Sequence, residues 1–214
     1  MAAREYGQYC GVTRALELVG ERWALLLVRD LLVGPRRYGE LAAGLPRIPS
    51  NILAARLKEL QAAGIIRRAP RSRIVIYELT PYGRELEPVV LALSVWGFRA
   101  LDEPRDDQVV TPDAMTITLR SAFQRDAAAS LPPTRYAAVI GADELDIRVD
   151  GSALAIARGA GEPADLVFAA DTGIRRLLSG ELAAEPAIAA GAVEIVRGPA
   201  VLLDRFARTF RIAA

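Results

Sequence analysis

Apolar residues recur every three or four positions through most of the first hundred residues, which predicts a segment built from helices. The pattern is most distinct where Leu53, Leu57 and Leu60 give one helix a single apolar stripe. Ser50 is the expected N-cap of that helix, and Gly64 is expected to end it. The helices predicted on this basis cover residues 12–20, 22–33, 38–45 and 50–63.

Two short strands and a long helix are expected to follow. Residues 65–69 and 74–79 favour strands, and the arginine-containing segment 70–73 between them is expected to form a hairpin tip. Thr80 and Pro81 give the next helix an N-cap and a first residue, and it should run to about residue 101. A polar-faced helix followed by a basic hairpin is the order of a recognition helix and its wing.

The pattern changes after residue 101. Residues 102–114 hold two prolines and five acidic residues and are expected to form a linker. Residues 115–123 alternate between apolar and polar, which predicts a strand. The whole chain is therefore predicted to be α+β, with domains at 1–101 and 115–214. Further strands are expected at residues 137–140, 145–149, 153–157, 166–170 and 193–196, and helices at residues 172–179, 184–190 and 200–210.

Composition excludes several kinds of site. The 214 residues include no histidine and one cysteine, Cys10. Disulfides within one chain, zinc sites of cysteine and histidine, and histidine-dependent catalysis are therefore excluded. No cofactor or catalytic motif is present, so we expect neither an enzyme nor a bound metal or cofactor. The apolar runs are too short to span a membrane and the start lacks a signal-peptide pattern, which predicts a cytoplasmic protein without membrane contact.

Charge and the outward residues of the predicted recognition helix indicate double-stranded DNA as a partner. Residues 1–103 carry a net charge of +4 and residues 104–214 a net charge of −3. Asn51 could pair with adenine, and Ala54 or Ala55 could contact a thymine methyl group. For any single arginine a solvated turn is the simpler explanation, so the argument depends on the order of the elements. The candidate DNA-binding residues are Arg36, Arg37, Ser50, Asn51, Ala54, Ala55, Lys58, Arg71 and Arg73.

Three segments within residues 10–101 carry more specific motifs. They read CGVTRALELVGERWALLLVRDLLVGPRRYGEL, LPRIPSNILAARLKELQAAGIIRR and YELTPYGRELEPVVLALSVWG. In these blocks the chain resembles the HxlR-type, MarR-like winged helix-turn-helix transcriptional regulators. The resemblance implies a homodimer that binds a near-palindromic DNA operator. Gly11 departs from the family pattern, which often has proline after the cysteine.

The same resemblance implies that the first and last helices of this domain form the dimer interface. Arg56, usual at this place in the family, could contact a phosphate or pair with an acid inside the domain. Cys10 could be a redox or electrophile sensor, with Arg14 one turn away favouring the thiolate, or a small apolar residue of the interface. The residues implied for the interface are Val12, Leu16, Val89, Val90, Leu93, Trp96 and Leu101.

The C-terminal half carries a weaker resemblance. The segment PADLVFAADTGIRRLLSGELAAEPAIAAGAVEIVRGPAVLLDRFARTF is similar to the sterol-carrier-protein-2-like fold. That fold implies a hydrophobic tunnel for fatty-acyl, sterol-like or other apolar ligands. For each residue taken alone, packing in the core is the simpler explanation. The residues that would line such a tunnel are Leu177, Leu178, Leu182, Ile188, Val193 and Phe206.

These observations predict a dimeric, sequence-specific DNA-binding regulator, by default a repressor, whose C-terminal domain binds an apolar or lipid-like effector. In one alternative that domain serves only as a structural or partner-docking module, and in another Cys10 senses oxidants or electrophiles. An enzyme acting on an apolar substrate is the third and least supported alternative. The operator, the effector and the regulated genes are not encoded in any of these patterns.

Overall fold

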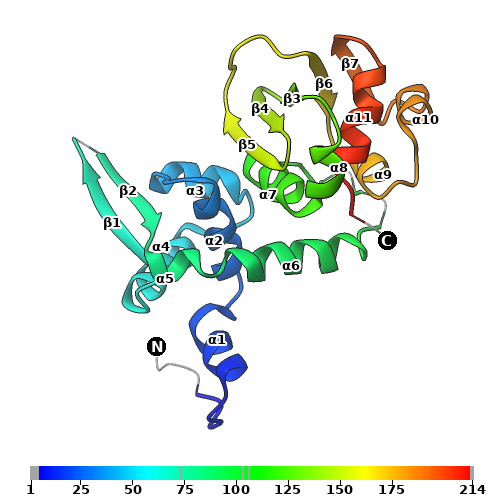
Figure 1. The fold of residues 1–214 in the computed structure, drawn as a ribbon. Helices are drawn as coiled ribbons and strands as arrows, with labels where there is room; N and C mark the ends of the chain where they lie inside the picture. Colours follow the sequence, from blue (N-terminus) through cyan, green and yellow to red (C-terminus); the bar gives the residue numbers. More distant parts are fainter. Residues whose placement is uncertain (1–4, 73, 103, 106, 213–214) are drawn as a thin grey trace. The chain divides into compact units, whose positions relative to one another are not determined.

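The computed structural model describes residues 5–72, 74–102, 104–105 and 107–212 (Figure 1). The chain divides into two compact units, residues 1–90 and residues 91–214. Among the described residues, no helix combines the length and the apolar character needed to span a bilayer. The mixed helix and strand content confirms the α+β prediction.

The first unit is a winged helix-turn-helix domain, and its element order confirms the prediction. Leu27, Leu31, Leu41 and Leu53 are fully buried and form part of its core. The helices and strands are α1 Gly11–Val19, α2 Ala24–Val33, α3 Tyr38–Gly44, α4 Ser50–Ala62, β1 Ile66–Arg71, β2 Ile74–Leu79 and α5 Pro81–Arg84, and α6 Glu87–Phe98 begins in this unit.

Helix α4 has the predicted apolar stripe and the predicted end. The stripe of Leu53, Leu57 and Leu60 is at most 2% exposed. Gly64 has φ +69°, and the N–H groups of Gly64 and Ile65 donate to the carbonyls of Gln61 and Leu60, which is the Schellman arrangement. The prediction for Ser50 was wrong, because Pro49 is the N-cap and Ser50 is the first helical residue.

The long helix predicted after the wing is two helices. Thr80 is the N-cap as predicted, and its Oγ1 accepts a hydrogen bond from the Gly83 N–H at 3.1 Å. The chain leaves the helical path after α5 and re-enters it at Glu87, immediately before Pro88. Proline inside a helix lacks the N–H donor and collides with the carbonyl four residues earlier, here that of Arg84. Pro88 therefore accounts for the break.

The second unit begins with a helix where a strand was predicted. Residues 112–122 form α7 Pro112–Ala122, with Thr111 as N-cap accepting from the Ala114 N–H at 3.2 Å. Met115 and Leu119 are buried, which is helical spacing, and Ile117 and Thr116 are buried as well. Because this helix is buried on several sides, its apolar residues do not form one stripe, and their order in the sequence resembles the alternation of a strand. The Thr-Pro pair that begins α5 also begins α7, and that signal could have identified the helix.

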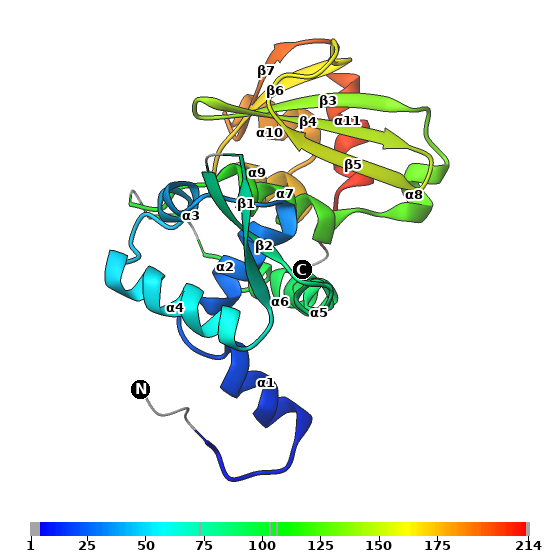
Figure 2. The same cartoon turned by 90° about the vertical axis from the view of Figure 1, so that its left-hand side faces the viewer.

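A five-stranded mixed sheet with strand order β5-β4-β3-β6-β7 follows α7 (Figure 2). Strand β3 pairs antiparallel with β4 and parallel with β6, and β6 pairs antiparallel with β7. The five strands predicted for this sheet are all present, and each end lies within three residues of its predicted position. Their bounds are β3 Thr134–Ile140, β4 Asp143–Asp150, β5 Ala153–Arg158, β6 Leu166–Ala170 and β7 Val193–Arg197.

One face of this sheet packs against helices around an aromatic cluster. The Phe206 ring lies 5.2 Å from Tyr136, 4.9 Å from Phe168 and 4.6 Å from Phe210, measured between ring centroids. All four side chains are 0% exposed. The helices of this unit after α7 are α8 Arg125–Ala129, α9 Ile174–Leu178, α10 Ala184–Ala189 and α11 Val201–Thr209.

Burial raises the pKa of Tyr136 to about 12. The stability that comes from keeping this phenol neutral is complete below its unfolded pKa of about 10, and is lost as the pH rises toward 12. We expect Tyr136→Phe to change stability by less than about 1 kcal/mol at pH 7, because the ring is kept and the hydroxyl has no hydrogen-bond partner among the described residues. At pH 11, about one unit above the unfolded pKa, the variant should escape a loss of about 1.4 kcal/mol. Urea unfolding at pH 7 and pH 11 measures both.

Tyr82→Phe is the matched control, because Tyr82 is 52% exposed. Equal alkaline losses in Tyr136→Phe and in the unchanged protein would contradict the assignment.

Candidate nucleic-acid interface

Helix α4 presents a narrow face of small and polar residues to solvent. Asn51, Ala54 and Lys58 are exposed and Ala55 is half-buried. Asn51, Ala55 and Lys58 follow one another at i, i+4 and i+7, so they lie on one side of the helix, opposite the leucine stripe. The structure therefore brings together, on the outer side of α4, four of the residues that the sequence placed there.

The start of α4 is tied to α3 by a residue that sequence reasoning missed. The Tyr38 hydroxyl donates a hydrogen bond to the Ser50 carbonyl at 2.9 Å. No side chain caps the first N–H groups of α4, because Pro49 occupies the N-cap position. A helix N-terminus without a cap can bind an anion such as a DNA phosphate. Its place at the start of α3, directly after two arginines, is the sequence signal that could have identified Tyr38.

Arg36 and Arg37 connect α3 to the wing. Arg36 forms an antiparallel bridge with Tyr77 of β2, with N–H···O distances of 3.0 and 2.7 Å. Its side chain is half-buried, and Nη1 donates to the Pro35 carbonyl at 3.1 Å. The Arg37 N–H donates to Glu40 Oε2 at 2.6 Å, whereas its side chain is exposed. Arg37 thus offers a solvent-facing cation at a fixed backbone position.

The wing is a basic hairpin with one partly neutralising acid. Arg67, Arg68 and Arg71 of β1 are exposed. Glu78, which is 8% exposed, pairs with Arg67 at 2.7 Å and more distantly with Arg71 at 3.8 Å. The predicted contact Arg73 lies outside the described residues. Arg67 and Arg68 were missed, although their place in the first strand beside the basic tip could have identified them.

Arg56 pairs inside the unit. The side chain is 9% exposed, its Nη1 contacts Glu59 and its Nη2 lies 3.6 Å from Glu21. Of the two interpretations of this residue, the structure therefore favours the internal ion pair. Pairing of a buried guanidinium avoids the cost of an isolated buried charge.

Exposed apolar residues lie on α1 and α6, where a dimer interface was implied. On α1, Val12 is 70% exposed and Leu16 is 48% exposed. On α6, Val89, Leu93 and Trp96 are exposed and share one face at i, i+4 and i+7, and Leu101 beyond the helix is exposed as well. Val90 differs, because it is 7% exposed in the single chain and has little surface left for a partner.

Cys10 is an exposed free thiol at the N-cap of α1. Hydrogen bonds from the backbone N–H groups of Thr13 and Val12 lower the pKa of this thiol. The stabilisation of the thiolate thus comes from the start of the helix. Arg14 pairs with Glu17 at 3.1 Å, so its positive charge is shared with a carboxylate.

Four of the six residues implied for a ligand tunnel are buried in the core of the second unit, and the other two pack against it. Leu177, Leu178 and Phe206 are 0% exposed and Val193 is 1% exposed. Leu182 and Ile188 are partly buried and pack against the same core. Burial of this kind is consistent with packing in the core, the simpler explanation for each residue taken alone, and their assignment to a ligand site stays a prediction.

Known proteins resemble the first unit. The family model of HxlR-like helix-turn-helix proteins matches residues 18–105. An uncharacterised HTH-type transcriptional regulator of Mycobacterium tuberculosis is 44% identical over 96 residues, which are 44% of this chain and 60% of the relative. One of Synechocystis is 35% identical over 102 residues, 46% of this chain and 76% of the relative.

Among solved structures, the redox regulator HypR in its oxidised form is 34% identical, with a TM-score of 0.42, over 44% of this chain and 99% of that one. The chain spans 60% of the length of the mycobacterial relative and 76% of the length of the Synechocystis relative. The chain is more than 30% identical to regulators of which it covers more than two thirds of the length. It therefore belongs to the family of HxlR-like helix-turn-helix transcriptional regulators.

Proposed function

We propose that this protein is a homodimeric, sequence-specific DNA-binding regulator that acts as a repressor. The observation that carries the proposal is the solvent-facing side of α4, where Asn51, Ala54 and Lys58 are exposed beside the uncapped helix N-terminus. Small side chains allow the helix to approach base edges closely, and Asn51 supplies a donor and an acceptor for adenine. Family membership supports the same conclusion.

Phosphate contacts would come from residues around that face. The N–H groups at Ser50 and the Lys58 ammonium would bind one strand, and Arg37 would reach the backbone from the beginning of α3. Arg71 of the wing lies 3.8 Å from Glu78, which is a long ion pair, and its guanidinium would leave this acid to bind a phosphate. These contacts fix the position of the protein, and the base contacts of α4 select the sequence.

A second copy of the chain is the proposed partner of the exposed apolar faces. Val12 and Leu16 on α1, and Val89, Leu93 and Trp96 on α6, would lose water on association. A two-fold dimer presents two copies of α4 to half-sites about one helical turn, roughly 34 Å, apart. Leu101 lies just beyond α6 and would extend the interface.

Control by a ligand is the proposed role of the second unit. The order of β6, α9, α10, β7 and α11 supports the sterol-carrier-like resemblance. A ligand changes DNA affinity only by binding two states of the dimer unequally. The packed interior equally supports the alternative of a structural or partner-docking module. The exposed Cys10 thiol with its lowered pKa supports thiol sensing as a second input.

Asn51→Ala should weaken binding to the preferred DNA by about 1–3 kcal/mol and relax selectivity at one base pair. The measurement is fluorescence anisotropy with an operator selected from random DNA and with its single-base-pair variants. Gln61→Ala, on the same helix near its C-terminal end, is the matched control. Unchanged affinity and selectivity in Asn51→Ala would show that α4 does not read bases through this residue.

Arg37→Ala should weaken binding to all sequences alike, because a phosphate contact carries no base information. The slope of log K against log salt should become shallower by about 0.9 for each phosphate that the protein no longer neutralises. Titrations at four salt concentrations measure it. Arg197→Ala removes an exposed arginine of β7 and should leave the slope unchanged. Identical slopes for both variants would place Arg37 away from the DNA.

Leu93→Asp should shift the protein from dimer to monomer, because the interface would bury an unpaired carboxylate. We expect the dissociation constant of the dimer to rise at least about a hundredfold, or roughly 2.7 kcal/mol. Sedimentation equilibrium gives this constant directly. Val201→Asp introduces the same charge at an exposed apolar residue of another helix and serves as control. A dimer that persists in Leu93→Asp would remove α6 from the interface.

A further inference from the structure

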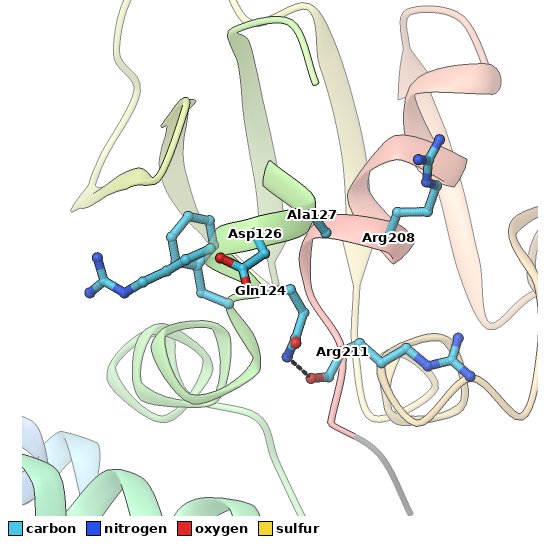
Figure 3. Close-up of a pocket in the computed structure, with 7 residues that line it drawn as sticks. Gln124, Asp126, Ala127, Arg208 and Arg211 are labelled. Atoms are coloured by element: carbon cyan, nitrogen blue, oxygen red, sulfur yellow. Dashed lines mark hydrogen bonds between the residues drawn. The ribbon is translucent and has the colours of Figure 1, made fainter. Parts of the chain in front are cut away.

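Two arginines of the wing converge on one acid, which distinguishes them from the arginines at a surface depression of the second unit. That depression has a volume of about 600 Å³, and Figure 3 shows its arginines Arg208 and Arg211 extending in different directions. In the wing, Arg67 and Arg71 both approach the carboxylate of Glu78. The wing therefore holds the more closely organised group of charges.

Glu78 uses a different oxygen for each of the two arginines. Its Oε1 accepts a hydrogen bond from Arg67 Nε at 2.7 Å, and its Oε2 lies 3.8 Å from Arg71 Nη2. Because Arg67 faces Glu78 directly in the register of β1 and β2, its contact is the shorter one. One carboxylate thus holds one arginine tightly and a second one loosely.

The acid is covered by protein, whereas its two arginines are exposed. The side chain of Glu78 is 11% exposed, against 65% and 66% for the two arginines. The preceding residue, Tyr77, exchanges two backbone hydrogen bonds with Arg36, and the following residue, Leu79, is 2% exposed. The backbone is therefore held on both sides of Glu78, and the arginines rather than the acid are the groups that can move.

Stability alone does not account for an acid at this position. A carboxylate with so little exposure loses hydration, and an ion pair to an exposed guanidinium contributes only about 0–1 kcal/mol. A threonine or a valine would suit the strand without that cost. The charge of Glu78 is therefore better explained by what it does to the arginines.

DNA phosphates would compete with Glu78 for the same guanidinium groups. Moving a guanidinium from a carboxylate to a phosphate exchanges one charge-assisted hydrogen bond for another, so the net gain in binding is small. While Arg67 stays paired, its charge is balanced at close range and adds little to the release of counterions from DNA. Strand β1 packs against α4 (Figure 2), so both arginines lie near the helix that is proposed to read DNA.

We propose that Glu78 restrains the wing by holding Arg67 and Arg71 away from the DNA backbone until phosphates displace it. The residue acts through the two arginines and sets how strongly the protein binds DNA of any sequence, whereas α4 selects the sequence. This inference rests on the proposed function, because it requires the wing to approach DNA. It gives Glu78 the opposite effect from that of a residue that only stabilises the hairpin.

Glu78→Gln tests the proposal, because it removes the negative charge and keeps a side chain of nearly the same shape. On a short duplex of random sequence at low salt, this variant should bind at least about fivefold more tightly than the unchanged protein. The slope of log K against log salt should become steeper by about 0.9 for each arginine that is released to a phosphate. Glu78→Thr removes the same charge with a residue that suits a strand, and should show the same gain. Fluorescence anisotropy titrations at four salt concentrations measure affinity and slope.

Glu85→Gln removes an exposed acid from the same unit and controls for the change in net charge. It should leave affinity and slope unchanged. A double-mutant cycle separates restraint from hairpin stability. In a chain that carries both Arg67→Gln and Arg71→Gln, adding Glu78→Gln should no longer tighten binding. Thermal melts establish that all variants are folded.

The proposal is overturned if both Glu78 variants bind DNA as the unchanged protein does or more weakly. It is overturned as well if Glu85→Gln gains as much affinity, or if the gain persists without the two arginines. In each of these outcomes the unchanged protein still binds DNA, so the regulator stands and the role of Glu78 is lost. Failure of the unchanged protein and of the Glu78 variants to bind any DNA would contradict the proposed function and the restraint together.

Discussion

The burial of the leucine stripe of α4 is the constraint on which the candidate DNA interface depends. With Leu53, Leu57 and Leu60 inside, helical geometry leaves Asn51, Ala54 and Lys58 no direction except outward. The Schellman end of α4 then sets the direction in which the chain enters β1. The packing of one stripe therefore orients both the recognition helix and the wing that follows it.

Both units pair buried charges internally. In the first, buried ions are satisfied internally, as in the contacts of Arg56 with Glu21 and Glu59, and the exposed cations surround α4 and the wing. In the second, the Arg135 guanidinium pairs with the Asp146 carboxylate at 2.6 Å, and aromatic and aliphatic side chains fill the interior between sheet and helices.

Much of the first unit could be predicted because its signals are local. Periodic leucines, Gly64 and the Thr80-Pro81 cap each act within a few residues, and the structure has them where the sequence placed them. Predictions failed where packing on several sides removed the period, as in α7, and where a proline inside an apolar run was overlooked, as at Pro88. The position of Tyr38 after two arginines could mark it as functional, but nothing in the sequence identifies Ser50 as its partner, because the two residues belong to different helices.

The sequence by itself determined the α+β composition, the winged helix-turn-helix order and the face of α4 that points to solvent, since these follow from residue spacing and turn chemistry. Only the tertiary structure decided that Arg56 pairs with Glu21 inside the unit, and that Leu177, Leu178, Val193 and Phe206 meet in one core. Those outcomes depend on which distant segments come into contact, and a one-dimensional pattern does not contain that information.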